Sequence, residues 1–207
     1  MEHSLDDQIR EIKHSFRSYM NGVTAQSMRD KGLSYFVNWG IQLPHLTEMA
    51  KQYGKDERLA IALWKENTRE CKILATMIMP SEKMQKDMAE LWMEQMPSQE
   101  IAEIAVFNLF QYLSDAPILA FQWIARSEPI YQIAGFNLIA RLFVKGQELS
   151  EMGINEYLDQ AGVAISDKNI SIRKAALNSL IRFSNQGSEY AMLVRKALPE
   201  VSDMVAE

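Results

Sequence analysis

Residues 115–144 read DAPILAFQWIARSEPIYQIAGFNLIARLFV, and this stretch carries the start signals of two helices. Asp115 and Pro117 can begin a short helix through Arg126, because the first turn of a helix tolerates proline. The tripeptide Ser-Glu-Pro that follows gives the same kind of signal for a second helix over about 129–144. The stretch therefore predicts a pair of helices joined by a short turn.

The same order of features recurs along the chain. Three predicted helices carry an alanine about one turn before a tryptophan near the helix end, at Ala60 and Trp64, Ala89 and Trp92, and Ala120 and Trp123. The tetrapeptide FNLF at 107–110 returns as FNLI at 136–139 and, more faintly, as LNSL at 177–180. Helical pairs that repeat in this way predict an α-solenoid, in which each pair buries its apolar face against its neighbours. The alternative is a chance recurrence among the Leu- and Ala-rich helices of an ordinary bundle.

Helix signals cover most of the remaining chain. Ser4, Thr68 and Ser81 are expected N-caps. Further helices are predicted after Ser98 and at 4–20, 44–53, 56–67, 68–79, 81–96, 151–165, 169–184 and 188–198. A less regular stretch follows the first of them, up to Gly40. No alternation of apolar and polar residues is long enough to predict a strand. We therefore expect about twelve helices, an all-α solenoid of HEAT-like helical pairs, and one domain over 1–207.

The composition is that of a globular protein, with 207 residues, 47% hydrophobic residues and a formal net charge of −5. An acidic chain is not an obvious nucleic-acid binder, so any DNA binding must come from a local basic patch. No apolar run approaches the roughly 18 residues of a membrane span, and the start of the chain is too polar for a signal peptide. We therefore expect a cytoplasmic protein that does not bind a membrane.

Few residues suggest reactive chemistry. The only cysteine, Cys71, lies in an apolar helical pattern and is expected to be a buried hydrophobe. The histidines at 3, 14 and 45 lack the spacing of a metal site. Neither a phosphate loop nor a nucleotide fingerprint occurs, so we expect no metal and no cofactor. The tryptophans near helix ends are expected to pack between repeats rather than to stack on bases.

A basic helix stands out near the end of this acidic chain, in the stretch SDKNISIRKAALNSLIRF at 166–183. At about 100° per residue, one face within about 80° holds Ser171, Lys174, Asn178, Arg182 and Asn185, and a different face holds Ile172, Ala176, Leu180 and Phe183. The polar face can contact successive DNA phosphates, and Arg173, Arg141 and Lys145 can extend the patch. A merely solvated helix face explains the pattern equally well.

Four segments, in this order, resemble the DNA alkylation repair family, the HEAT-like-repeat DNA glycosylases of AlkD type. They are YFVNWGIQLPHLTEMA at 35–50, LAIALWKENTRECKILATMI at 59–78, WIARSEPIYQIAGFNLI at 123–139 and SIRKAALNSLIRF at 171–183. The resemblance implies helical pairs curled around a positively charged concave face. In the family this face grips duplex DNA, and the enzyme removes alkylated purines without flipping the base.

The resemblance also implies which positions carry the reaction. The family's catalytic Trp and the Asp four residues later correspond to Gln99 and Glu103, and its second aromatic corresponds to Asn178. The basic pair before Ala-Gly-Phe corresponds to Gln132 and Ile133. A carboxylate can stabilise the positive charge that glycosidic cleavage builds on the sugar, but Gln99 has no aromatic face to hold a cationic base. Glu103 is thus the candidate catalytic residue, and the alternative for it is a solvated helix residue.

Three functions stay open on this reading. The favoured one is a DNA alkylation repair-like protein that binds duplex or unusual DNA through backbone contacts, with weak or no glycosylase activity. The second is an active 3- or 7-alkylpurine glycosylase that uses Glu103. The third is a HEAT-repeat scaffold that binds a protein partner, which agrees with the acidic net charge.

Overall fold

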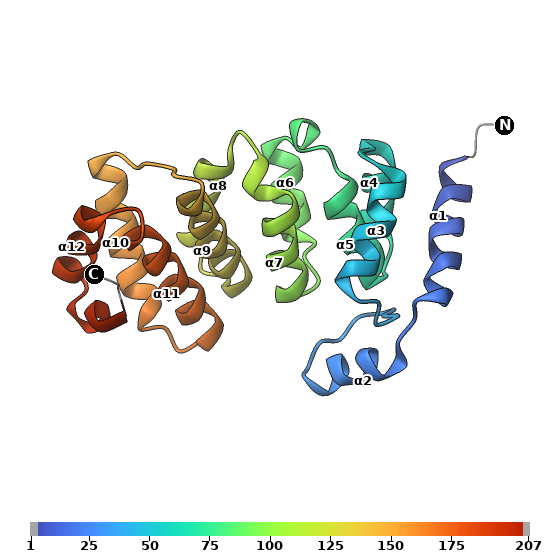
Figure 1. Ribbon diagram of the computed structural model, residues 1–207, viewed down its shortest axis with the longest axis horizontal. Helices are drawn as coiled ribbons and strands as arrows, with labels where there is room; N and C mark the ends of the chain where they lie inside the picture. Colours follow the sequence, from blue (N-terminus) through green and yellow to red (C-terminus); the bar gives the residue numbers. More distant parts are fainter. Residues whose placement is uncertain (1–3, 205–207) are drawn as a thin grey trace. The chain divides into compact units, whose positions relative to one another are not determined.

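The computed structural model describes residues 4–204, which form helices α1 to α12 and four short 3-10 segments (Figure 1). These residues contain no strand, and one isolated parallel bridge joins Val37 and Thr68. The all-α prediction is therefore confirmed. Within the same residues, no helix has both the length and the apolar character needed to cross a membrane. The chain divides into two compact units, residues 1–109 and 110–207, and one domain over 1–207 stays a prediction.

The first unit holds seven α-helices among its described residues. They are α1 (Leu5–Ser15), α2 (Gly22–Asp30), α3 (Leu43–Tyr53), α4 (Glu57–Lys65), α5 (Arg69–Ile78), α6 (Lys86–Glu94) and α7 (Gln99–Asn108), with 3-10 segments at Phe16–Ser18 and Ser81–Lys83. Helix α5 packs against α3, α4 and α7, and so lies at the centre of this unit. The aromatic rings of Trp64 and Trp92 stack with centroids 4.1 Å apart, so these tryptophans join α4 to α6 as expected.

Of the predicted caps, Ser4 is confirmed, whereas Thr68 and Ser81 are wrong. The side chains of Ser4, Asp56 and Ser98 each accept a hydrogen bond from a backbone N–H in the first turn of the helix that follows. Thr68 makes no such cap bond, because it is buried at the bridge to Val37. Ser81 begins only a 3-10 segment, and α6 starts later, after Gln85.

The first predicted helix is also shorter than expected. Helix α1 gives way to a 3-10 segment at Phe16, whose ring is buried, so the chain turns before Met20. The less regular stretch contains α2, which the sequence did not predict. Asn21 caps α2 by accepting a hydrogen bond from the backbone N–H of Thr24 at 2.9 Å.

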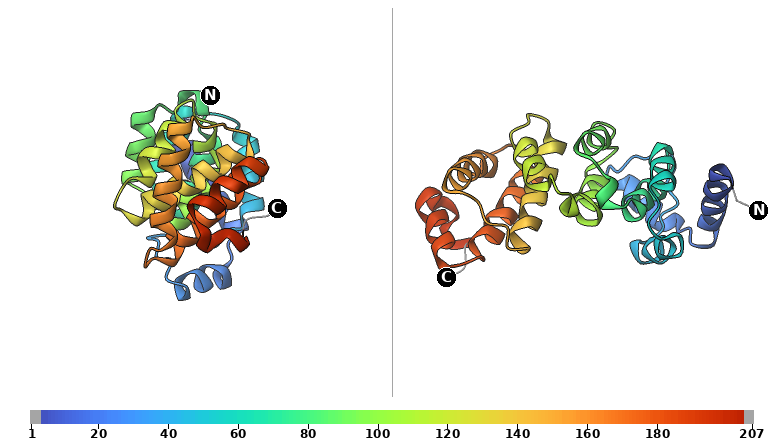
Figure 2. Two further views of the ribbon diagram at one scale, coloured as in Figure 1. Left: turned by 90° about the vertical axis from the view of Figure 1, so that its left-hand side faces the viewer. Right: turned by 90° about the horizontal axis from the view of Figure 1, so that it is seen from above.

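The second unit consists of α8 (Ala116–Ile124), α9 (Pro129–Val144), α10 (Glu151–Ile165), α11 (Ile170–Ser184) and α12 (Ser188–Ala197), with 3-10 segments at Phe110–Tyr112 and Pro199–Met204. Helix α9 packs against both α8 and α11, and α10 packs against α11 (Figures 1 and 2). Residues 115–144 therefore form the predicted helical pair, α8 and α9.

A glycine explains how closely this pair packs. A Cβ atom at Gly135 would lie 2.7 Å from the backbone nitrogen of Ile124 and 3.0 Å from the Cβ of Trp123. No side chain fits at such distances, so the glycine of the Ala-Gly-Phe segment lets α9 approach α8. Trp123 is fully buried beneath this contact, in agreement with its predicted packing role.

Candidate nucleic-acid interface

Helix α11 buries the face that the sequence predicted. The helix starts at Asn169, whose side chain accepts a hydrogen bond from the backbone N–H of Ser171 at 2.8 Å. The buried face contains Ile172, Ala176, Leu180 and Phe183. Phe183 packs 5.0 Å from Phe143 of α9 and 5.3 Å from Tyr157 of α10, ring centroid to centroid. This aromatic cluster fixes the rotation of α11 and leaves the predicted stripe on the outer side.

The stripe itself is accessible. Lys174 and Arg182 are exposed, and Asn178 between them is half-buried. Within residues 4–204, neither cation forms a hydrogen bond or an ion pair. An exposed cation with no carboxylate partner keeps its full charge for a ligand. The structure thus brings these three predicted residues together on one face of α11.

Arg173, also predicted to bind DNA, has a structural task. Its Nη1 donates hydrogen bonds to the backbone carbonyls of Asp167, at 2.6 Å, and Lys168, at 3.2 Å. These bonds tie the turn before α11 to the first turn of the helix. Arg173 adds positive charge to this end of α11 while its guanidinium group is held by the protein.

Arg141 and Lys145 lie at the C-terminal end of α9, where both reach the 3-10 segment around Gln111. Arg141 donates from Nε to Oε1 of Gln111 at 3.2 Å, and Lys145 donates from Nζ to the backbone carbonyl of the same residue at 2.8 Å. The ammonium group of Lys145 also lies 3.8 Å from the centre of the Tyr112 ring. Burial, and to a lesser extent the charge of Arg141, lowers the pKa of Lys145. These two cations are therefore held in place before any ligand arrives.

The charge of the two helices contrasts with that of the whole chain. Residues 129–145 and 170–185 contain five basic residues and neither Asp nor Glu, although the chain has a net charge of −5. Basic residues near helix C-termini also interact favourably with the helix dipole, so Arg141 and Arg182 stabilise their helices as well. The second unit thus concentrates basic residues on two helices that pack against each other.

Glu103 belongs to α7 in the first unit. It is exposed, and its Oε1 accepts a hydrogen bond from Nε2 of Gln99 at 2.7 Å. It lines a pocket of about 410 Å³ together with Phe107, whose side chain is 56% exposed, and Asn108. Phe107 was not among the predicted site residues, although an aromatic residue four positions after a carboxylate shares its helix face and was a readable signal. Asn178, at the position of the family's second aromatic, lies in the other unit.

The first unit also contains a buried ionic network that the sequence did not predict. The guanidinium group of Arg69 is 2% exposed and donates to both carboxylate oxygens of Glu100, at 3.0 and 2.6 Å, and to Glu70 at 3.2 Å. Tyr35 donates to Glu100 at 2.5 Å. Burial alone would raise the pKa of Glu100, but the bonds from Arg69 and Tyr35 outweigh it and lower that pKa. Burial, together with its bond to Glu100, raises the pKa of Tyr35.

This network is structural in character. The carboxylate of Glu70 accepts hydrogen bonds from the backbone N–H groups of Trp39 and Ile41, each at 3.2 Å. It thereby fixes the extended segment before α3 to the start of α5. The Arg-Glu dipeptide that contributed to the family resemblance thus holds the first unit together, because both side chains are buried and fully paired.

The described residues contain neither an activated thiol nor a metal-binding cluster. Cys71 is buried, as expected, and burial raises its pKa to about 12, so the thiol stays protonated near neutral pH. Across residues 4–204, no three His, Cys, Asp or Glu side chains gather closely enough to hold a metal ion. His3 lies outside the described residues.

Comparison with known proteins places the chain in a family. The family model described as DNA alkylation repair enzyme matches residues 12–198, which is most of the chain. No curated protein gives a significant match. Among solved structures, the chain resembles a member of a family related to the HEAT-like repeat DNA glycosylases with affinity for branched DNA structures. The TM-score is 0.75 at 16% identity, over 89% of this chain and 82% of that one. The structural likeness confirms the HEAT-like helical fold, and the match to the family model shows that the chain belongs to the DNA alkylation repair enzyme family.

Proposed function

We propose that this protein binds DNA through the basic face of α11 and has weak or no glycosylase activity. The observation that supports the proposal most directly is the pair of exposed cations, Lys174 and Arg182, which have no acidic partner in the described part of an acidic chain. Selection for solubility does not require such a segregated basic face, whereas phosphate binding does.

The spacing of the stripe suits a nucleic-acid backbone. Lys174, Asn178 and Arg182 recur every four residues, so they lie roughly 6 Å apart along the axis of α11. Two cations and an amide in a row can donate to several phosphate oxygens without reading a base. Arg141 and Lys145 add two cations of the same unit to this proposal, held at Gln111 near the C-terminal end of α9.

Branched DNA is the preferred form in this proposal. The solved relative has affinity for branched DNA structures, and it shares the fold of this chain over most of its length. Contacts to the DNA backbone carry no sequence information, so a protein that relies on them distinguishes one DNA molecule from another by its shape. A junction offers phosphates from more than one duplex arm to a single protein face.

The residues at the family's aromatic positions argue against efficient glycosidic cleavage. Gln99 and Asn178 cannot offer a π face to a cationic base. In addition, Gln99 holds the carboxylate of Glu103 by a hydrogen bond. A second candidate function, alkylpurine glycosylase activity through Glu103, is favoured only by the exposed ring of Phe107 in the same pocket.

Fluorescence anisotropy with a labelled four-way junction and a linear duplex of equal length tests the proposal. We expect saturable binding at low salt, tighter for the junction, and a loss of at least about tenfold in Lys174→Glu. Lys65→Glu is the matched control, because Lys65 is also exposed but lies on α4 of the first unit.

Two results would contradict the proposal. The first is the absence of salt-dependent binding to either DNA, which would leave the protein-binding scaffold as the better hypothesis. The second is an equal loss of affinity in both variants, because it would mean that only net charge matters.

A further inference from the structure

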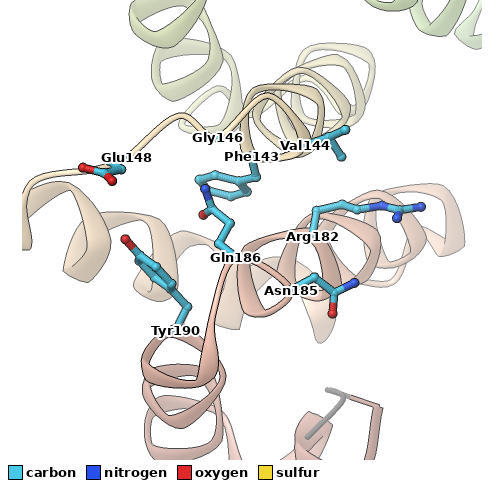
Figure 3. Close-up of a pocket in the computed structure, with 8 residues that line it drawn as sticks. All are labelled: Phe143, Val144, Gly146, Glu148, Arg182, Asn185, Gln186 and Tyr190. Atoms are coloured by element: carbon cyan, nitrogen blue, oxygen red, sulfur yellow. The ribbon is translucent and has the colours of Figure 1, made fainter.

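A pocket of about 370 Å³ opens where α9, α11 and α12 meet in the second unit (Figure 3). Its buried base is Phe143, and Tyr190 of α12 packs against Phe183 with ring centroids 5.0 Å apart. The volume falls within the roughly 300–1,000 Å³ typical of small-molecule sites. Arg182, the last cation of the α11 stripe, lies on its wall.

Gln186 gives this pocket an unfilled hydrogen-bonding position. Its Nε2 donates to the backbone carbonyl of Gln147 at 3.1 Å, which fixes the orientation of the amide group. The amide oxygen Oε1 then faces the other way; it is buried and has no hydrogen-bond donor. An unpaired buried acceptor costs about 1–3 kcal/mol, and a ligand N–H group at this point would remove the cost.

The other polar side chains of the pocket fall into two groups. Figure 3 shows Glu148 and Tyr190 on one side of Gln186, and Arg182 and Asn185 on the other. No side chain of these four forms a hydrogen bond or ion pair among residues 4–204. The first side therefore offers acceptors, namely a carboxylate, a hydroxyl and the Gln186 amide oxygen. The guanidinium group of Arg182 extends away from Gln186.

We propose that this pocket receives an unpaired nucleobase from bound DNA, with a preference for guanine, while Arg182 holds the adjacent phosphate. The inference rests on the proposed DNA-binding function and adds a site that recognises a base. Successive backbone contacts along α11 would lead the strand to Arg182, and an unpaired base at a branch point could then enter the pocket beside it.

The acceptors account for the preference. Guanine presents two adjacent donors on its pairing edge, the ring N–H and the exocyclic amino group, which match the Gln186 amide oxygen and the Glu148 carboxylate. Thymine presents one ring N–H between two carbonyl oxygens, and these would face the same acceptors unfavourably. The rings of Tyr190 and Phe143 supply an apolar surface for either base.

The test uses two three-way junctions with identical arms, which differ only in one unpaired base at the branch point, guanine or thymine. We expect the wild-type chain to bind the guanine junction about tenfold more tightly, because loss of a buried hydrogen bond costs about that factor. Gln186→Leu and Glu148→Ala should each abolish the preference while they leave affinity for a fully paired junction unchanged. Gln122→Leu and Glu151→Ala are exposed matched controls in the same unit, and they should retain the preference.

The outcomes separate the pocket from the proposed function. Binding to all junctions without a base preference, or a preference that both pocket variants retain, would overturn the pocket proposal and leave DNA binding intact. If the chain binds no DNA, the proposed function fails, and the pocket is tested with guanosine and thymidine monophosphates. Selective, saturable shifts of the Gln186 side-chain amide resonances by the guanine nucleotide would then support the pocket, and their absence would overturn it.

Discussion

Glu103 and Phe107 stand four residues apart on α7, so their side chains share one face of the helix. In a glycosylase the carboxylate stabilises positive charge on the sugar, and an aromatic face holds the cationic base. Here the aromatic residue follows the carboxylate instead of preceding it, and Gln99 occupies the preceding position and bonds to Glu103. We therefore expect no release of 3- or 7-methylpurine from alkylated duplex DNA above background, with excess protein and chromatographic detection. Release by the wild-type chain that Glu103→Gln abolishes, and that the exposed control Glu94→Gln retains, would contradict this expectation and establish the second candidate function.

At the scale of the elements, the bond between Arg69 and Glu100 joins the start of α5 to the start of α7. We expect Glu100→Gln to lower the free energy of unfolding by about 3 kcal/mol at pH 6, because it leaves the buried Arg69 with Glu70 as its one carboxylate partner among the described residues, beside the carbonyl of Ile41. The folded-state pKa of Glu100 is lowered, so its contribution is fully present above the unfolded-state value of about 4.3 and is lost as the pH falls through the folded-state value. The difference between wild type and variant in urea unfolding should therefore shrink between pH 6 and pH 3. A difference that stays constant over this range, or a similar loss in the exposed control Glu94→Gln, would contradict the assignment.

The same elements show how far the sequence could predict this molecule. The cap Ser4 and the helix starts at Asp56 and Ser98 were readable because N-capping is local chemistry, and the buried face of α11 was readable because it depends only on helical periodicity. Helix α2 was not, since it begins at a glycine and has few apolar residues to mark a face. The Tyr35–Glu100 bond joins residues 65 positions apart, and the pocket around Gln186 combines three helices, so neither leaves a local pattern. For the candidate site, the cationic stripe could be predicted from the sequence, whereas the pocket at the end of that stripe could not.

For the whole molecule, the decisive question is whether DNA binding depends on local charge or on net charge. A chain with net charge −5 is repelled by DNA at long range, so any affinity must come from released counterions at the basic face. The logarithm of the binding constant should fall linearly with the logarithm of the salt concentration, by about 0.9 for each phosphate contacted.

The double variant Lys174→Gln, Arg182→Gln should make this slope shallower by about 2, in anisotropy titrations of a four-way junction. Arg58→Gln, Lys65→Gln changes the net charge equally at two exposed residues of α4 and should leave the slope unchanged. Equal slopes for wild type and the α11 variant would show that these two cations do not contact phosphates, whatever the absolute affinity.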